Sequence, residues 1–198
     1  MAFELIAGHP ALDFVNTLDW RFGGKSPEEL LKSYGHLLEF AEQSKVLTAV
    51  QARRLERAGA ASSGAQALAS CREFREALAE VFYAGLDARS PSAAARETLE
   101  RYIQAARGRQ KLNWRQSPRL EWEWPDSDRD ARLPLWALAI GASELMTSET
   151  VDRLRACDNP ECRWLFLDTS KNHTKRWCDM RLCGNRMKAR RFKAQHKA

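Results

Sequence analysis

The residues best suited to chemistry in this chain are four cysteines near its C-terminal end. Cys157 and Cys162 form one C-x4-C pair, Cys178 and Cys183 form a second, and fifteen residues separate the pairs. One tetrahedral metal ion needs two chelating pairs of soft ligands, joined by a loop that can fold back. The spacing therefore predicts that Cys157, Cys162, Cys178 and Cys183 bind one zinc ion.

Disulfides, an iron–sulfur cluster and four unrelated buried thiols are the alternatives to a zinc site. Disulfides suit a secreted chain, but the N-terminus lacks the basic lead and long apolar run of a signal peptide. The paired spacing fits a single zinc ion better than a cluster. His173 lies between the pairs and is an alternative ligand. Because four thiolates close the coordination shell, we expect a structural rather than a catalytic ion.

The elements that must hold this ion follow from the residues between and after the pairs. Residues 164–167 alternate aromatic and leucine side chains, which predicts a strand. The polar run 168–174 predicts a turn, and residues 175–177 would return as a second strand. From Asp179 onward no proline interrupts a helical pattern. We therefore predict a knuckle, a hairpin and a helix around one metal, a treble-clef-like zinc finger.

The C-terminal helix carries a concentrated positive charge. From Gly184 to Ala198 there are six Lys and Arg residues and no acidic residue. At 100° per residue, one narrow stripe of the helix holds Arg186, Arg190, Lys193 and Lys197. An adjacent apolar stripe would pack on the zinc module and leave the basic stripe for a polyanion. The alternative is a solvated basic tail.

Three strings in this region resemble the CGNR zinc finger: L-F-L-D-T-S-K-N at 165–172, R-W-C at 176–178 and C-G-N-R at 183–186. The resemblance covers about the last fifty residues. It implies that the four cysteines bind zinc and that the module binds DNA in bacterial transcription regulators. With the residues that its motif singles out, the predicted nucleic-acid contacts are Asn185, Arg186, Lys188, Arg190, Arg191, Lys193 and Lys197.

The net charge of +6 is divided unevenly along the chain. Residues 151–198 carry 13 Lys and Arg against 5 Asp and Glu, whereas the first 150 residues carry 19 against 21. This asymmetry indicates a basic binding module joined to a nearly neutral domain. No run of residues is long and apolar enough to span a membrane. Reduced thiols without an export signal predict a cytoplasmic protein.

A second resemblance lies near the N-terminus. The run H-P-A-L-D-F-V-N-T-L at 9–18 resembles the start of the ABATE domain, the usual companion of the CGNR finger. It implies a ligand- or stress-sensing domain over residues 1–148, followed by the finger over residues 149–198. Asp13, Asn16 and Thr17 share one face of the predicted helix. They would form a solvated face, a buried polar cluster or a ligand contact.

The rest of the first 148 residues is predicted to be mainly helical. Ser26 followed by Pro27, Glu28 and Glu29 predicts a helix start. Further helices are expected at 65–86, 92–106, 133–146 and 148–155. Residues 112–124 alternate tryptophans with polar side chains, which predicts a hairpin whose apolar face covers the helical core or lines a ligand pocket. The fold class is therefore α+β.

No recognisable catalytic motif accompanies these features. The sequence has no phosphate-binding glycine-rich loop, nucleophile elbow or metalloprotease helix, so we expect no enzyme. We predict a DNA-binding transcription regulator with a small-molecule effector domain. It would act as a homodimer if its small DNA-binding module gains affinity by binding next to a second copy. The alternative is a zinc-stapled module that binds a protein or RNA.

Overall fold

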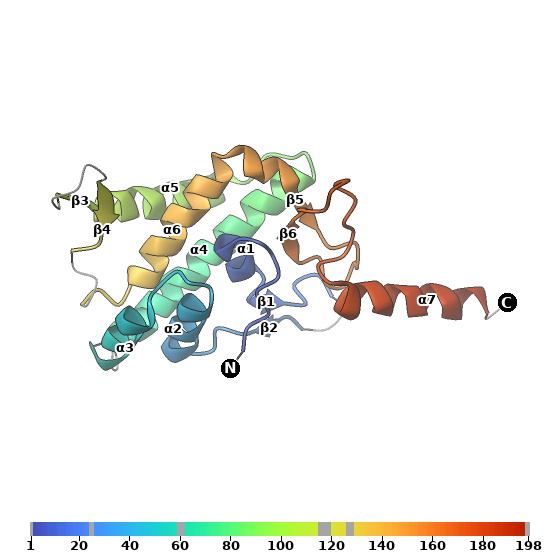
Figure 1. Ribbon diagram of the computed structural model, residues 1–198, viewed down its shortest axis with the longest axis horizontal. Helices are drawn as coiled ribbons and strands as arrows, with labels where there is room; N and C mark the ends of the chain where they lie inside the picture. The colour runs from blue at the N-terminus through green and yellow to red at the C-terminus, as the bar shows by residue number, and fades with distance from the viewer. Residues whose placement is uncertain (1, 24–25, 59–61, 115–119, 126–128, 197–198) are drawn as a thin grey trace.

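The predicted α+β class is confirmed: helices dominate, and the strands form small antiparallel pairs. A computed structural model describes residues 2–23, 26–58, 62–114, 120–125 and 129–196. The body is built around α4 (Ser62–Leu86), with α5 (Ala93–Arg107) and α6 (Leu133–Met146) packed along it. Figure 1 shows α7 (Asn185–Gln195) projecting from one end of this body and the hairpin of β3 (Lys111–Asn113) and β4 (Glu121–Glu123) at the other.

A line of aromatic rings joins the helices through the core. The Phe14 ring of α1 (Pro10–Val15) lies 5.9 Å from Phe40 of α2 (Tyr34–Gln43) and 6.3 Å from Phe74 of α4. Tyr102 of α5 then stands 5.8 Å from Phe74 and 6.3 Å from Trp136 of α6. These rings fix α1 at the centre of the bundle, where it can position the C-terminal segment.

The helix start predicted at Ser26 is wrong. Glu28–Glu29 forms strand β2, which pairs with β1 (Leu18–Asp19), and α2 begins later, after Ser33. Ser33 caps that helix by accepting a hydrogen bond from the His36 amide at 3.2 Å. Glu29 has a tertiary role that overrides the local signal, because both its carboxylate oxygens accept hydrogen bonds from the buried Arg75, at 2.8 and 2.6 Å. A short helix α3 (Ala49–Ala58) follows α2.

The predicted tryptophan hairpin forms, but its apolar face does not cover the core. Strands β3 (Lys111–Asn113) and β4 (Glu121–Glu123) pair with Leu112 opposite Trp122. Trp114 is 78% exposed and Trp122 is 62% exposed, so of the three tryptophans only Trp124 packs against the helices. Residues 115–119, which would contain the turn of the predicted hairpin, lie outside the described residues.

The C-terminal segment differs from the prediction in its strand pairing. A 3₁₀ helix (Glu149–Arg153) leads into β5 (Leu154–Ala156), which pairs antiparallel with β6 (Leu165–Leu167). The predicted strand 164–167 is therefore confirmed as β6. The predicted return strand at 175–177 does not form, because β5, which precedes the first cysteine, takes the place beside β6.

The zinc-binding segment shares the core of the helical body. The largest buried apolar cluster contains residues of α1, α4 and α6 together with β6 and the four clustered cysteines. Cys71 of α4 is also fully buried in this cluster, and burial raises the pKa of its thiol. Across the parts of the chain that the structure describes, none of the helices combines the length and apolarity that a bilayer crossing requires.

Candidate metal centre and basic helix

The structure brings the four predicted cysteine ligands together. Their Sγ atoms all lie within 4.8 Å of one another, and those of Cys162 and Cys178 are 3.8 Å apart. All four side chains are buried, and all four are free thiols rather than disulfides. Cys157 and Cys162 flank the first knuckle, and Cys178 and Cys183 flank the second.

This geometry fits a zinc ion. Four thiolates at the usual Zn–S distance of about 2.3 Å place their sulfurs about 3.8 Å apart, which the Cys162–Cys178 spacing already matches. No carboxylate or imidazole among the described residues joins the group. His173 is exposed, and its Nδ1 lies 3.4 Å from the Asp168 carbonyl oxygen instead. Bound zinc would cross-link the two knuckles, and its closed shell would leave no position for water or substrate.

The clustered thiols change one another's proton affinity. Hydrogen bonds from Cys162 and Cys178 lower the pKa of Cys157 to about 7. Hydrogen bonding with Cys157 raises the pKa of Cys162 and lowers that of Cys183. Zinc requires every ligand as the thiolate, so its binding would release protons and weaken at acid pH.

Asn159 organises the first knuckle. Its carbonyl oxygen accepts hydrogen bonds from the amides of Cys162 at 2.9 Å and Arg163 at 3.0 Å, which closes the turn. Its side chain is fully buried and donates through Nδ2 to Cys183 Sγ at 3.4 Å. One residue therefore shapes the first ligand pair and contacts the second, the role of an outer-shell group at metal sites.

The second knuckle is a single π-helical turn (Met180–Gly184) that runs directly into α7. Asp179 caps it, because its Oδ1 accepts from the amides of Arg181 at 2.6 Å and Leu182 at 3.2 Å. A Cβ at Gly184 would stand 2.6 Å from the Met180 sulfur and 3.2 Å from Trp177 Cδ1. A side chain at this position would therefore displace the flexible, 48% exposed Met180 side chain where the metal-binding turn becomes the helix.

Asp168 shapes the polar loop between the knuckles. Its Oδ1 accepts hydrogen bonds from the Ser170 amide at 2.9 Å and the Ser170 hydroxyl at 2.6 Å, and its Oδ2 accepts from the Lys175 amide at 3.0 Å. The hydrogen bond from Ser170 is the largest cause that lowers the pKa of Asp168. The carboxylate thus supplies the turn that the sequence predicts for 168–174.

The three polar residues predicted on the N-terminal helix form a buried cluster, not a solvated face. Asp13, Asn16 and Thr17 are 7%, 4% and 2% exposed. Asp13 accepts a hydrogen bond from the Ala7 amide at 2.9 Å, and Thr17 accepts one from Arg75 at 3.0 Å. Burial raises the pKa of Asp13 to about 6, against the opposing effect of backbone hydrogen bonds. Their contact with a ligand stays a prediction.

Asn16 forms hydrogen bonds with the edge of β6 that faces away from β5. Its Oδ1 accepts from the Leu165 amide and its Nδ2 donates to the Leu165 carbonyl, both at 2.9 Å. Leu167, two residues along the same edge, donates its amide to the Ala7 carbonyl at 2.8 Å. The strand is thereby paired on both sides, by β5 and by groups from the N-terminus. The sequence alone could not reveal a contact between residues 149 positions apart.

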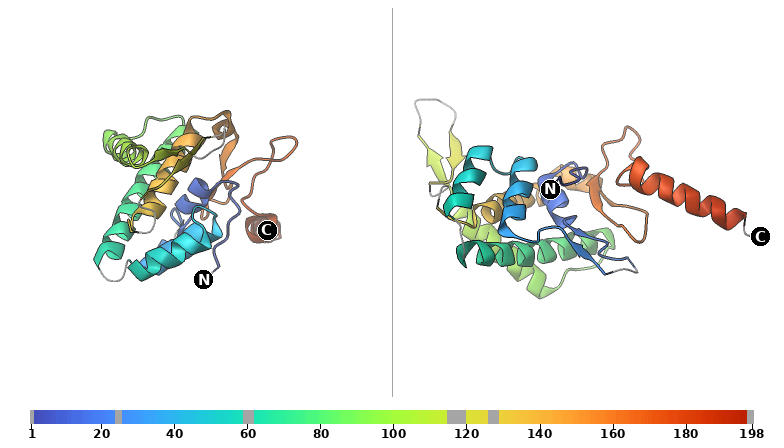
Figure 2. Two further views of the ribbon diagram at one scale, coloured as in Figure 1. Left: turned by 60° about the vertical axis from the view of Figure 1, so that its left-hand side comes forward. Right: turned by 90° about the horizontal axis from the view of Figure 1, so that it is seen from below.

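The helix α7 exposes its predicted nucleic-acid contacts. None of its residues is buried, and it extends away from the body in Figure 1 and in the right-hand view of Figure 2. Asn185, Arg186, Lys188, Arg190, Arg191 and Lys193 are all exposed on it. Lys197 lies outside the described residues. The predicted apolar stripe consists of Met180, Cys183, Met187 and Ala194 and packs only in its middle: Cys183 is buried and Met187 is half-buried, whereas Met180 and Ala194 are exposed.

Two residues of the predicted basic stripe contact the protein itself. The Arg186 guanidinium lies 5.1 Å from the centre of the Trp20 ring, and Arg190 donates to Glu161 at 2.7 Å. Lys188, Arg191 and Lys193 form no ion pair with any described residue. The cations available to an outside partner are therefore mainly those beside the predicted stripe, with Lys193 the described member of the stripe that stays unpaired.

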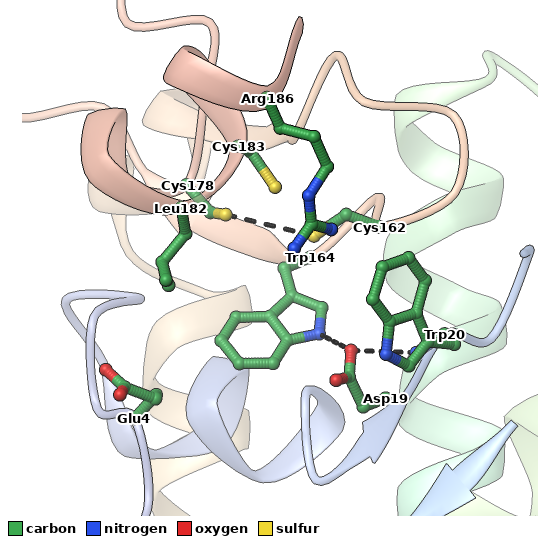
Figure 3. Close-up of a pocket in the computed structure, with 9 residues that line it drawn as sticks. All are labelled: Glu4, Asp19, Trp20, Cys162, Trp164, Cys178, Leu182, Cys183 and Arg186. Carbon is green, nitrogen blue, oxygen red and sulfur yellow. Dashed lines mark hydrogen bonds between the residues drawn. The ribbon is translucent and has the colours of Figure 1, made fainter.

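A pocket of about 230 Å³ lies where the N-terminal residues meet the metal centre. Figure 3 shows its lining side chains, with Arg186 extending toward the Trp20 and Trp164 rings. Asp19 Oδ1 accepts hydrogen bonds from the Trp164 indole and the Trp20 amide, each at 2.8 Å. Burial raises the pKa of Asp19. Sequence reasoning did not predict a role at this site for Asp19, Trp20 or Asn159, because none of them belongs to a recognised pattern.

The family comparisons agree with the geometry. The model of the CGNR zinc finger matches residues 153–196. The ABATE model, described as "Putative stress-induced transcription regulator", matches residues 8–149. Neither description names an enzyme. A search of curated proteins found no match. Since the ABATE match spans well over half of the chain and the four cysteines of the second match lie together, the chain belongs to the ABATE family and carries a C-terminal CGNR zinc finger.

Proposed function

We propose that this protein is a cytoplasmic, DNA-binding transcription regulator that contacts DNA through α7. The observation that carries the proposal is a helix without buried residues, attached directly to a metal-binding turn. Residues 185–196 hold five Lys and Arg residues and no acidic residue. Such a helix can enter the major groove, and its cations neutralise phosphates. The zinc ion would fix the direction in which the helix leaves the body.

The proposed roles of the helix residues differ with their surroundings. Lys188, Arg191 and Lys193 have no internal partner among the described residues, so they would bind phosphates at little cost. Arg190 would have to leave Glu161, and Arg186 would have to leave Trp20. Asn185 stands at the first position of the helix, and Lys197 follows its end, so both belong to the proposed contact surface.

Charge-neutralising variants test this proposal against a matched control. The test variant is Lys188→Gln/Arg191→Gln/Lys193→Gln. The control is Lys45→Gln/Arg57→Gln/Arg96→Gln, which makes the same change in net charge at exposed positions of the helical body. Fluorescence polarisation of zinc-loaded protein with a random-sequence duplex would be recorded at salt concentrations from about 50 to about 200 mM.

The expected result follows from counterion release. Each lost phosphate contact reduces the slope of log K against log salt by about 0.9, so the test variant should lose between two and three units of slope and bind at least tenfold more weakly at low salt. The control should retain the wild-type slope. Equal behaviour of the two variants, or no duplex binding by the wild type, would refute the proposal.

A second candidate is an RNA- or protein-binding zinc module. Phe192 is 62% exposed on α7, and the His196 ring stacks on it with centroids 4.0 Å apart. Exposed rings of this kind suit stacking on unpaired bases. Binding to single-stranded RNA that exceeds duplex binding, and that falls on Phe192→Ala, would favour this candidate.

We assign the regulatory part of the function to residues 1–148, which would act as the effector-sensing domain. Residues 149–198 would be the zinc finger. A homodimer would bring two copies of α7 to one DNA site. Analytical ultracentrifugation with and without duplex DNA tests the dimer, whose absence from the DNA complex would remove that part of the proposal.

A further inference from the structure

The pocket at the metal centre has walls from both ends of the chain. Glu4, Asp19 and Trp20 come from the N-terminal part, whereas Trp164, Leu182 and Arg186 come from the finger. Its volume of about 230 Å³ exceeds the roughly 150 Å³ of an engineered cavity that binds benzene, so one small molecule fits. Figure 3 shows that the Arg186 side chain enters this space from the start of α7.

The charges around the pocket are mostly negative. Glu4 and Asp19 line it, and the sulfurs of Cys162, Cys178 and Cys183 form part of its wall. Four thiolates around one Zn²⁺ leave two net negative charges, which adds to the effect of the carboxylates. Arg186 is the one positive group among the lining residues. An anionic ligand would therefore meet more repulsion than attraction.

The aromatic wall is also suited to a cation. The negative face of an indole attracts a positive group within about 6 Å of its centre, and Arg186 already lies 5.1 Å from the centre of the Trp20 ring. The backbone of Trp20 has a left-handed φ of 54°, and two hydrogen bonds hold it: its amide donates to Asp19, and its carbonyl accepts from the Gly23 amide. The side chain of Arg186 is thus an internal occupant of an acidic, aromatic-walled site.

We propose that this pocket binds a small organic cation, an amidinium, guanidinium or protonated amine on a compact stem, which takes the place of Arg186 on the Trp20 ring. The displaced Arg186 then points into solvent at the first turn of α7. Binding would thereby add one free cation to the surface proposed to contact DNA. This last step rests on the proposed function, whereas binding in the pocket does not.

The test uses three molecules of one shape and different charge: benzamidine, benzamide and benzoate. The full-length zinc-loaded protein is titrated with each, and the indole N–H signals of Trp20 and Trp164 are followed by NMR without DNA. Benzamidine should shift both signals saturably and bind at least tenfold more tightly than the other two molecules. Equal binding of benzamide, tighter binding of benzoate, or no saturable binding would overturn the proposal.

Variants then test the site and the replacement of Arg186. Trp20→Ala should weaken benzamidine binding at least tenfold, whereas Trp122→Ala, a matched change of an exposed tryptophan on the distant hairpin, should leave it unchanged. Glu4→Gln, at an exposed position, provides a test if Trp20→Ala does not fold, and should weaken binding at least threefold. Arg186→Gln removes the internal competitor and should tighten benzamidine binding; weaker binding by Arg186→Gln would show that the ligand does not replace this side chain.

A separate measurement tests the link to DNA. Saturating benzamidine should strengthen duplex binding by wild-type protein at fixed ionic strength and have no such effect on Arg186→Gln. Because pocket binding is measured without DNA, failure of the pocket proposal gives flat NMR titrations, whereas failure of the DNA proposal gives normal titrations without duplex binding.

Discussion

Replacing Asn16 by alanine should lower the free energy of unfolding by about 2–6 kcal/mol. The side chain is 4% exposed and satisfies both backbone groups of Leu165, which is itself fully buried. Alanine would leave one N–H and one C=O without partners, and each buried unsatisfied group costs about 1–3 kcal/mol. Since small domains are stable by only about 5–15 kcal/mol, this single change removes a large share of the total.

Urea denaturation of the zinc-loaded protein measures the effect through the transition midpoint and its slope. Asn172→Ala is the matched control, because Asn172 is exposed in the loop between the knuckles and should change stability by no more than about 0.5 kcal/mol. Zinc transfer from the folded variant to a colorimetric chelator should also be faster for Asn16→Ala, since β6 begins three residues after Cys162.

A small effect of Asn16→Ala would refute this reasoning. If the variant unfolds within about 0.5 kcal/mol of the wild type with an unchanged slope, the contact to β6 does not hold the strand in place. An equal loss in Asn16→Ala and Asn172→Ala would indicate a general sensitivity of the protein, not the loss of two particular hydrogen bonds.

Metal removal, the protonation of Asp13 and the truncation of tryptophans give three further tests. Zinc removal by a strong chelator should make residues 157–195 sensitive to protease while the helical signal in circular dichroism largely persists. A C-terminal segment that stays resistant to protease would show that zinc does not hold the finger folded. The pKa of Asp13 rises from 3.8 to about 6, so its contribution of up to about 3 kcal/mol is complete below pH 3.8 and lost as the pH rises through 6. The free energy of unfolding of Asp13→Asn and of the wild type would be measured by urea denaturation at each pH. The variant should lack this part of the pH dependence, and identical profiles of stability against pH would contradict the assignment to Asp13. Trp122→Ser should cost less than about 0.5 kcal/mol in urea denaturation because it is 62% exposed, whereas Trp136→Ala in the core should cost about 3–5 kcal/mol; similar losses would show that the hairpin face is covered in solution.

The sequence predicted best what depends on neighbouring residues. The helix over 133–146 forms with those bounds, because apolar residues run through it without a break and Pro134 stands in its first turn. The metal centre was also predictable, since chelating pairs impose short spacings and thiolates have few alternative uses in a reduced protein. These signals need no knowledge of the rest of the fold.

Contacts between distant segments were not predictable. The 26–29 segment has the local signature of a helix start, but the pairing of Glu29 with the buried Arg75 holds it as a strand. β6 was predicted as a strand, but the prediction that residues 175–177 pair with it was wrong, because β5 is equally short and equally near in sequence and takes that place. The exposed Trp122 shows the same limit, since an alternating pattern defines an apolar face without indicating what covers it.

The lack of buried residues in α7 has a thermodynamic consequence. Helices of its 11-residue length are marginal in water on their own, so most of its order must be propagated from the metal-binding turn at its start. Phosphates bound along it would relieve repulsion among its Lys and Arg side chains and complete the last turns. Part of the intrinsic binding free energy would therefore be consumed in folding the helix, and complex formation should carry a favourable enthalpy, an opposing entropy and a gain in helical circular dichroism.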